Sequence, residues 1–227
     1  MQQNRSHFKI TGSLFIMAAV SSIIGLKLYD PILADTDFVV SASSHRTQIV
    51  WGAINELILA STATGTGIML FPILKRFNES LGLGYLSFRI LEVVFIMVGT
   101  VSILTAMSVS EHFANGTISA KDNAQSLMLT LKSMHKWTFM LGPNFMLAIN
   151  TFLYSYVFLK LKAIPKNLSR LGLLAALLIM IAALLELFGI IAQISFWGIV
   201  LALPIALYEM TLAVWLIVKG VRPSLQM

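Results

Sequence analysis

The chain has 227 residues, of which 57% are hydrophobic and 11% are charged, and its mean hydropathy is +0.84. This composition excludes an ordinary soluble domain of that length and indicates an integral membrane protein. The formal net charge is +6 at pH 7, but the positive residues lie at the ends of apolar segments, which excludes a nucleic-acid footprint. The chain has no cysteine, which excludes disulfides and thiolate-bound metals.

Six stretches are long and apolar enough to cross a bilayer, which requires about 20 mostly apolar residues. They cover residues 10–28, 49–74, 86–107, 137–159, 171–191 and 198–218. The first has no cleavage site behind it and is expected to remain as a span. The sequence therefore predicts an all-α fold, a polytopic membrane protein that forms a bundle of six transmembrane helices in a single transmembrane domain over residues 1–227.

The connections between these stretches differ in charge. Those on the side of the two termini carry ten Lys and Arg residues, and those on the other side carry five. Since positively charged connections remain in the cytoplasm, both termini are expected there, and an even number of spans agrees with this. The first outer connection, residues 29–48, is predicted to be a solvated loop.

The longest outer connection, residues 108–136, contains a helical pattern. Leu127, Leu131 and Met134 recur at helical spacing, and Lys132 lies off that stripe. This pattern predicts an amphipathic helix at the outer interface, with the stripe on the bundle or the outer leaflet and Lys132 in water.

The fourth span contains Gly142 and Pro143. A proline inside a helix frees a carbonyl group and bends the helix, so a kink is expected in the outer third of this span.

Charged residues inside hydrocarbon are costly unless they are paired or wet, which makes them candidates for function. Arg89 and Glu92 are three residues apart and share one helix face. Counting about 1.5 Å per residue from the cytoplasmic helix ends brings five polar residues to similar depths. We call these five residues the Arg89 layer: Arg89, Glu92, Asn150, Tyr154 and Glu209.

If Arg89 pairs with one carboxylate of this layer, the other carboxylate is left over. The layer is then either a buried network that fixes helix register or a site for a proton, a cation or a polar head group.

A second set of polar candidates is expected nearer the outside: Glu56, His135, Asn144 and Glu186. Histidine and glutamate could bind zinc, but the four histidines of the chain lack metal-binding spacing, so we predict no metal and no cofactor. The sequence also has no recognisable catalytic triad and no phosphate-binding loop, so it predicts no catalytic residue.

Several motifs carry a family resemblance: FPILKRFNE at residues 71–79, LGLGY at 81–85, FRILE at 88–92, HKWTF at 135–139, LGP at 141–143, and residues 209–220 from Glu-Met to WLIVKG. At these motifs the chain resembles the bacterial membrane family catalogued as domain of unknown function 4386. The resemblance implies a six-helix protein of the bacterial cytoplasmic membrane and brings no known activity. It places Glu56, Arg89, Glu92, His135 and Glu209 inside recurring motifs, and members usually have an acidic residue where Lys136 stands.

Three functions remain open at this point. The leading hypothesis is that the protein binds or transports a small ligand, an ion or a proton through the Arg89 layer. The second is a sensory, immunity-type or accessory membrane protein, and the third is an intramembrane enzyme that acts on a lipid. The expected partners are the lipid bilayer and a small ligand or ion, and no nucleic acid. A cavity that reaches the layer would favour transport, a sealed layer would favour the second hypothesis, and a metal triad would favour the enzyme.

Overall fold

The computed structural model describes residues 2–222 and the side chains of residues 6–222. Within these residues every regular element is helical, which confirms the all-α class. In chain order they are α1 (Gln2–Leu28), α2 (Asp30–Leu33), α3 (Phe38–Ser44), α4 (Arg46–Phe77), α5 (Glu79–Ala114), α6 (Lys121–Phe139), the π-helix η1 (Met140–Met146), α7 (Leu147–Leu161), α8 (Lys166–Leu187) and α9 (Phe196–Val218).

Five helices of the described chain are long and apolar enough to cross a membrane. These segments are Ser6–Leu28, Arg46–Phe77, Glu79–Ala114, Lys166–Leu187 and Phe196–Val218. Large apolar side chains on their outer faces are exposed, as is expected of surfaces that face lipid. The chain is therefore a membrane protein. The fifth span had been expected to reach residue 191, but α8 ends at Leu187 because Gly189 turns the chain in a left-handed conformation with φ 69°.

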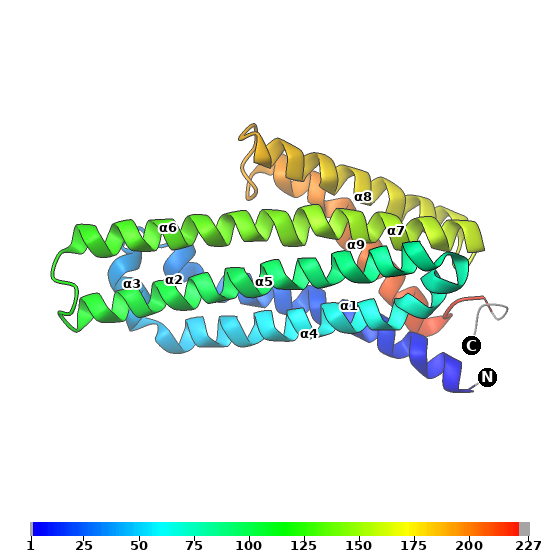
Figure 1. Cartoon of the computed structure of the whole chain (residues 1–227), viewed down its shortest axis with the longest axis horizontal. Helices are drawn as coiled ribbons and strands as arrows, with labels where there is room; N and C mark the ends of the chain where they lie inside the picture. Colours follow the sequence, from blue (N-terminus) through cyan, green and yellow to red (C-terminus); the bar gives the residue numbers. More distant parts are fainter. Residues whose placement is uncertain (1, 223–227) are drawn as a thin grey trace.

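The long helices run side by side, and α6, η1 and α7 follow one another as one rod beside α5 (Figure 1). Both chain ends lie at the same end of this bundle (Figure 1). Two contacts join them to neighbouring elements there. The Arg222 N–H donates to the Ala163 carbonyl at 3.1 Å, and a Cβ on Gly12 of α1 would lie 2.5 Å from the Ala213 carbonyl of α9.

At the opposite end, α5 and α6 extend beyond the other long helices (Figure 1). At about 1.5 Å per residue, the 36 residues of α5 span about 54 Å, against about 30 Å of hydrocarbon in a bilayer. The prediction of a solvated loop at residues 29–48 is wrong, since most of this segment folds into α2 and α3. Phe38 and Val39 are buried against this part of α5, and Ser110 of α5 donates to the Val39 carbonyl at 2.5 Å. These apolar residues shield the protruding stretch of α5 from water.

The helix predicted in the outer connection exists as α6, but it presents a different face to the protein. Its buried side chains include Met128 and His135, whereas Leu127 and Met134 of the predicted stripe are exposed. Lys132 is half-buried, with its Nζ 4.1 Å from the centre of the Phe38 ring. The predicted contrast between Leu131 and Lys132 is wrong, since both are half-buried. The reason is that α6 packs lengthwise on α5. Its buried face is therefore the one that contacts α5, whatever the apolar pattern of its sequence.

The segment around Pro143, where a kink was predicted, forms the π-helix η1. The Leu147 N–H donates to the Gly142 carbonyl, five residues earlier, instead of closing only ordinary α-helical bonds. Gly142 packs against α5, where a Cβ would lie 2.8 Å from Cβ of Phe95 and 3.2 Å from the Glu92 carbonyl oxygen. The π-helix therefore brings the rod into close contact with α5 next to the Arg89 layer.

Candidate functional site

Arg89 is buried between α4 and α5 and is held from both helices. Its Nη1 donates to both oxygens of Glu92, at 3.2 and 2.9 Å. Its Nε donates to the Ala63 carbonyl at 3.1 Å, and its Nε and Nη2 donate to the Thr66 hydroxyl at 3.1 and 2.8 Å. The charge is thus paired with one carboxylate and also bonded to neutral oxygens, as a cation in a membrane interior requires.

Glu92 connects this pair to the α6–η1–α7 rod. Asn150 of α7 donates from Nδ2 to Glu92 Oε2 at 2.7 Å, and both residues are buried. Arg89, Glu92 and Asn150 therefore form one hydrogen-bonded cluster across α5 and α7. Depth counting had placed these residues together.

Tyr154 and Glu209 lie beside this cluster without a hydrogen bond to it. Glu209 interacts electrostatically with Arg89 and Glu92, and Tyr154 interacts with Glu209. Tyr154 also stacks on Tyr208 of α9, with ring centres 6.0 Å apart, and meets Tyr85 of α5 edge-on at 5.9 Å. The five members of the Arg89 layer are thus neighbours, but only three of them are joined by hydrogen bonds.

Four buried oxygens of this region form no close hydrogen bond within the described residues. They are Asn150 Oδ1, Thr151 Oγ1, Tyr154 OH and Glu209 Oε1. The Thr151 and Tyr154 hydroxyls interact with one another, which leaves Asn150 Oδ1 and Glu209 Oε1 as the two oxygens without any polar neighbour of this kind. A buried polar atom that forms no hydrogen bond costs about 1–3 kcal/mol, so two of them in one region need an explanation.

Sequence reasoning missed several residues of the site. Neither Thr66 of α4 nor Thr151 of α7 was among the candidate residues of the sequence analysis. Ser155 shares a hydrogen bond of 2.8 Å with the Tyr208 hydroxyl. Gly172 of α8 makes this possible, because a Cβ there would overlap both groups. The available signal was the four-residue spacing of Asn150 and Tyr154 and of Thr151 and Ser155 along α7.

The outer candidates do not form one cluster. Asn144 donates to Glu186 at 3.0 Å, whereas His135 contacts the Tyr29 ring edge-on at 5.9 Å. Glu56 is buried against Gly25 of α1, where a Cβ would lie 2.7 Å from Glu56 Oε1. Among the described residues, no three His, Cys, Asp or Glu side chains are grouped so that they could hold a metal ion.

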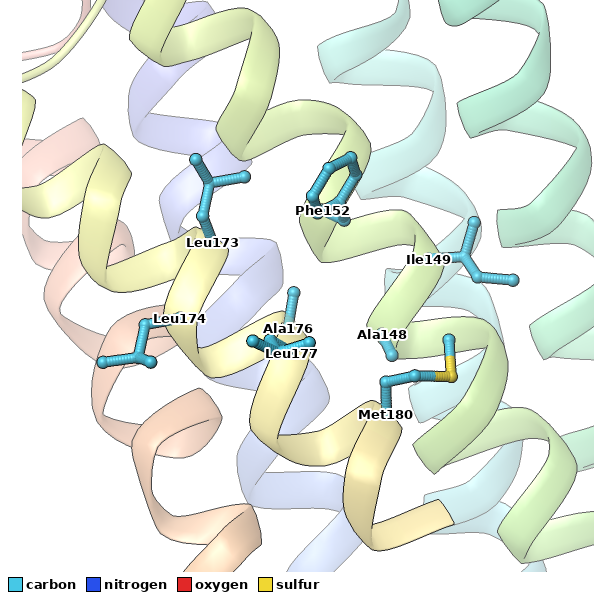
Figure 2. A pocket seen from close by; sticks show the side chains of 8 residues that line it. All are labelled: Ala148, Ile149, Phe152, Leu173, Leu174, Ala176, Leu177 and Met180. Atoms are coloured by element: carbon cyan, nitrogen blue, oxygen red, sulfur yellow. The ribbon is translucent and has the colours of Figure 1, made fainter. Parts of the chain in front are cut away.

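Four surface hollows are described, and none includes a residue of the Arg89 layer. One, of about 510 Å³, lies between α7 and α8. Figure 2 shows Phe152 and Ala148 of α7 facing Leu173 and Met180 of α8 across it. All eight of its lining side chains are apolar, which suits contact with lipid chains and offers no group for recognising a polar ligand.

The chain was compared with protein families, curated proteins and solved structures. A family model described as Domain of unknown function (DUF4386) matches residues 10–220. No curated protein and no solved structure matches the chain.

Proposed function

We propose that this chain, which belongs to the family described as Domain of unknown function (DUF4386), binds a proton or a small cation in the Arg89 layer and carries it through the membrane. The observation that supports this proposal is the set of buried oxygens described above, and in it Asn150 Oδ1 and Glu209 Oε1 in particular. Oxygen atoms alone make up this set, and oxygen is the ligand type that suits protons and hard cations.

The charge balance of the layer supports the same occupant. Arg89 and Glu92 neutralise one another through their paired hydrogen bonds. Glu209 adds a second carboxylate to the layer. The layer has no positively charged side chain besides Arg89 that could pair with it. A proton or a cation on Glu209 would remove the unpaired charge, and a cation would also be a ligand partner for the unsatisfied oxygen.

We propose a path of six spans, with the rod from Trp137 to Leu161 as the sixth. The α7 helix alone has 15 residues, too few to cross a bilayer, but η1 and the end of α6 extend it to sufficient length. Both termini would lie in the cytoplasm of a bacterial cell, since the richer Lys and Arg set lies at their end of the bundle.

Single cysteines in this cysteine-free chain test the orientation. A membrane-impermeant thiol reagent applied to intact cells should label a cysteine at Asn115 and spare one at Asn78. The reverse pattern would overturn the proposed topology.

Transport is tested with purified protein in liposomes that contain a pH-sensitive dye and carry an imposed potassium diffusion potential. The wild type should raise proton influx above that of empty liposomes, and Glu209→Gln should abolish the increase because an amide keeps the shape and loses the titration. Glu79→Gln is the matched control, since Glu79 is exposed and pairs only with Lys75 on the surface. A sodium-gradient arm distinguishes a proton from a metal cation.

A second function, sensory or accessory, is favoured by one observation: the four hollows do not reach the layer. A wild type without flux in either arm would support this alternative and contradict transport. Flux that survives in Glu209→Gln would contradict the assigned binding site.

A further inference from the structure

A hollow of about 400 Å³ lies where α6 meets the outer end of α1 and the turn between α8 and α9. We call it the outer pocket. Its polar lining includes Lys132, His135 and Lys136 of α6 and Gln193 of the α8–α9 turn, and its apolar wall includes Leu26 and Phe139.

The outer pocket has an excess of positive charge. Lys132 and Lys136 are one helical turn apart, and no carboxylate lines the pocket. Within the described residues neither lysine has a carboxylate at ion-pairing distance. Asp35 acts on Lys132 and Glu186 on Lys136 only at longer range. The other lysines of the outer side, Lys27 and Lys121, are each paired with an aspartate.

Two further N–H donors line the pocket. His135 is 8% exposed, and its ring meets the Tyr29 ring edge-on with centres 5.9 Å apart. Burial lowers the pKa of His135 to about 4, so at neutral pH the ring is uncharged and can donate one N–H. The Nε2 of Gln193 is buried without an acceptor. The Lys132 and Lys136 ammonium groups lie beside the aromatic rings of Phe38 and Trp137, which offer no negative charge of their own. Together with the N–H donors of His135 and Gln193, they are the chemistry that receives an anion.

The position of the pocket indicates which kind of anion it meets. The pocket lies level with the end of α1 at Leu28 and the end of α8 at Leu187, where spans leave the hydrocarbon. The adjoining turn exposes Phe188 and Ile194, and Trp197 follows at the start of α9, a pattern typical of a segment at the membrane interface. An anion at this depth with an apolar wall beside it matches the head group of a membrane lipid.

We propose that the outer pocket binds the phosphate group of an anionic phospholipid, with Lys132 and Lys136 on the phosphate and the chains along the apolar wall. This site is separate from the Arg89 layer and does not depend on transport.

Native mass spectrometry of the purified full-length protein, exchanged into nanodiscs of phosphatidylglycerol and phosphatidylcholine in equal amounts, tests the proposal. The wild type should retain phosphatidylglycerol selectively. The double variant Lys132→Gln/Lys136→Gln should bind it about 30-fold more weakly, from about 1 kcal/mol per lysine near an anionic surface. Lys27→Gln/Lys121→Gln removes the same charge from the same side and should leave retention unchanged. His135→Phe keeps the ring and should weaken retention several-fold.

Inorganic phosphate added at millimolar concentration distinguishes a site for a lipid phosphate from a site for free phosphate. Unchanged lipid retention supports a lipid site, whereas displacement of the lipid by phosphate would show a site for the free anion and overturn the proposal. Equal retention of the two lipids by the wild type, or equal losses in the two double variants, would also overturn it.

Discussion

The Arg89 layer and the outer pocket place polar groups at two depths of one bundle and treat charge in opposite ways. In the layer, Arg89 donates to oxygens on two helices and the surplus group is an acid. In the pocket, the surplus groups are two lysines that have no acid at pairing distance among the described residues. The difference shows that the depth of a charged side chain in the membrane determines which partners it needs. A buried cation needs its partners within the protein, whereas a cation near the interface can rely on water or lipid.

The largest effect is expected from breaking the Arg89–Glu92 pair. Arg89→Leu or Glu92→Leu alone leaves a buried charge without its partner and should lower the free energy of unfolding by about 3–5 kcal/mol. The double variant should lose much less than the sum of the two. Thermal melts of the four proteins in detergent measure this cycle, and additive losses would contradict the pairing.

A smaller effect is expected from Thr66→Val. The change keeps the shape of the side chain but removes the hydroxyl that accepts from Nε and Nη2 of Arg89. Loss of a hydrogen bond to a charged group costs about 1.5–3 kcal/mol. Thr105→Val is the control, because the exposed Thr105 hydroxyl bonds only to its own helix at Val101. Equal melting temperatures for the two variants would show that Arg89 does not need Thr66.

Acid should weaken the outer region by about 1 kcal/mol between pH 7.5 and 5.5 through His135. The folded pKa of about 4 lies below the ordinary value of 6.5, so between these values the unfolded chain binds more protons and stability falls as the pH falls. The groups around the ring are Tyr29, Lys132 and Lys136. Melts of the wild type and of His135→Phe at both pH values measure the difference. The same acid sensitivity in both proteins would exclude His135 as its source.

The smallest effect is expected from Glu209→Gln. Glu209 Oε1 has no hydrogen-bond partner to lose, so the variant should melt within about 1 kcal/mol of the wild type. The contrast with Glu92→Leu would then separate a carboxylate that holds the fold from one that is available to a ligand. A loss as large as that of Glu92→Leu would place Glu209 among the structural residues.

Part of the Arg89 layer could be predicted because spacing and depth are properties of single helices. Three residues separate Arg89 from Glu92, and counting from helix ends brings Asn150 to the same level. The contribution of Thr66 could not be predicted, because it depends on how closely α4 approaches α5. Gly67 permits that approach, since a Cβ there would lie 3.2 Å from Cγ of Arg89.

The limits on predicting the fold have a similar origin. Hydropathy located the long apolar helices because a span is recognised by composition alone. It missed α2 and α3, which contain few apolar residues. These residues are buried because they pack on the protruding part of α5. Hydropathy also did not identify the face of α6 that packs on α5. Gly99 of α5 lets His135 and Thr138 approach closely, with Thr138 Oγ1 only 2.9 Å from where a Cβ on Gly99 would be.

The π-helix η1 joins the two regions and fixes the rotational phase between them. An α-helix turns about 100° per residue, and a segment whose N–H groups reach five residues back accommodates an additional residue within the same helical path. Deleting one residue from 140–146 would rotate Lys132 and Lys136 by about 100° around the helix axis relative to Asn150. The number of residues in this segment is therefore what allows one rod to direct its lysines into the outer pocket and its asparagine toward Glu92.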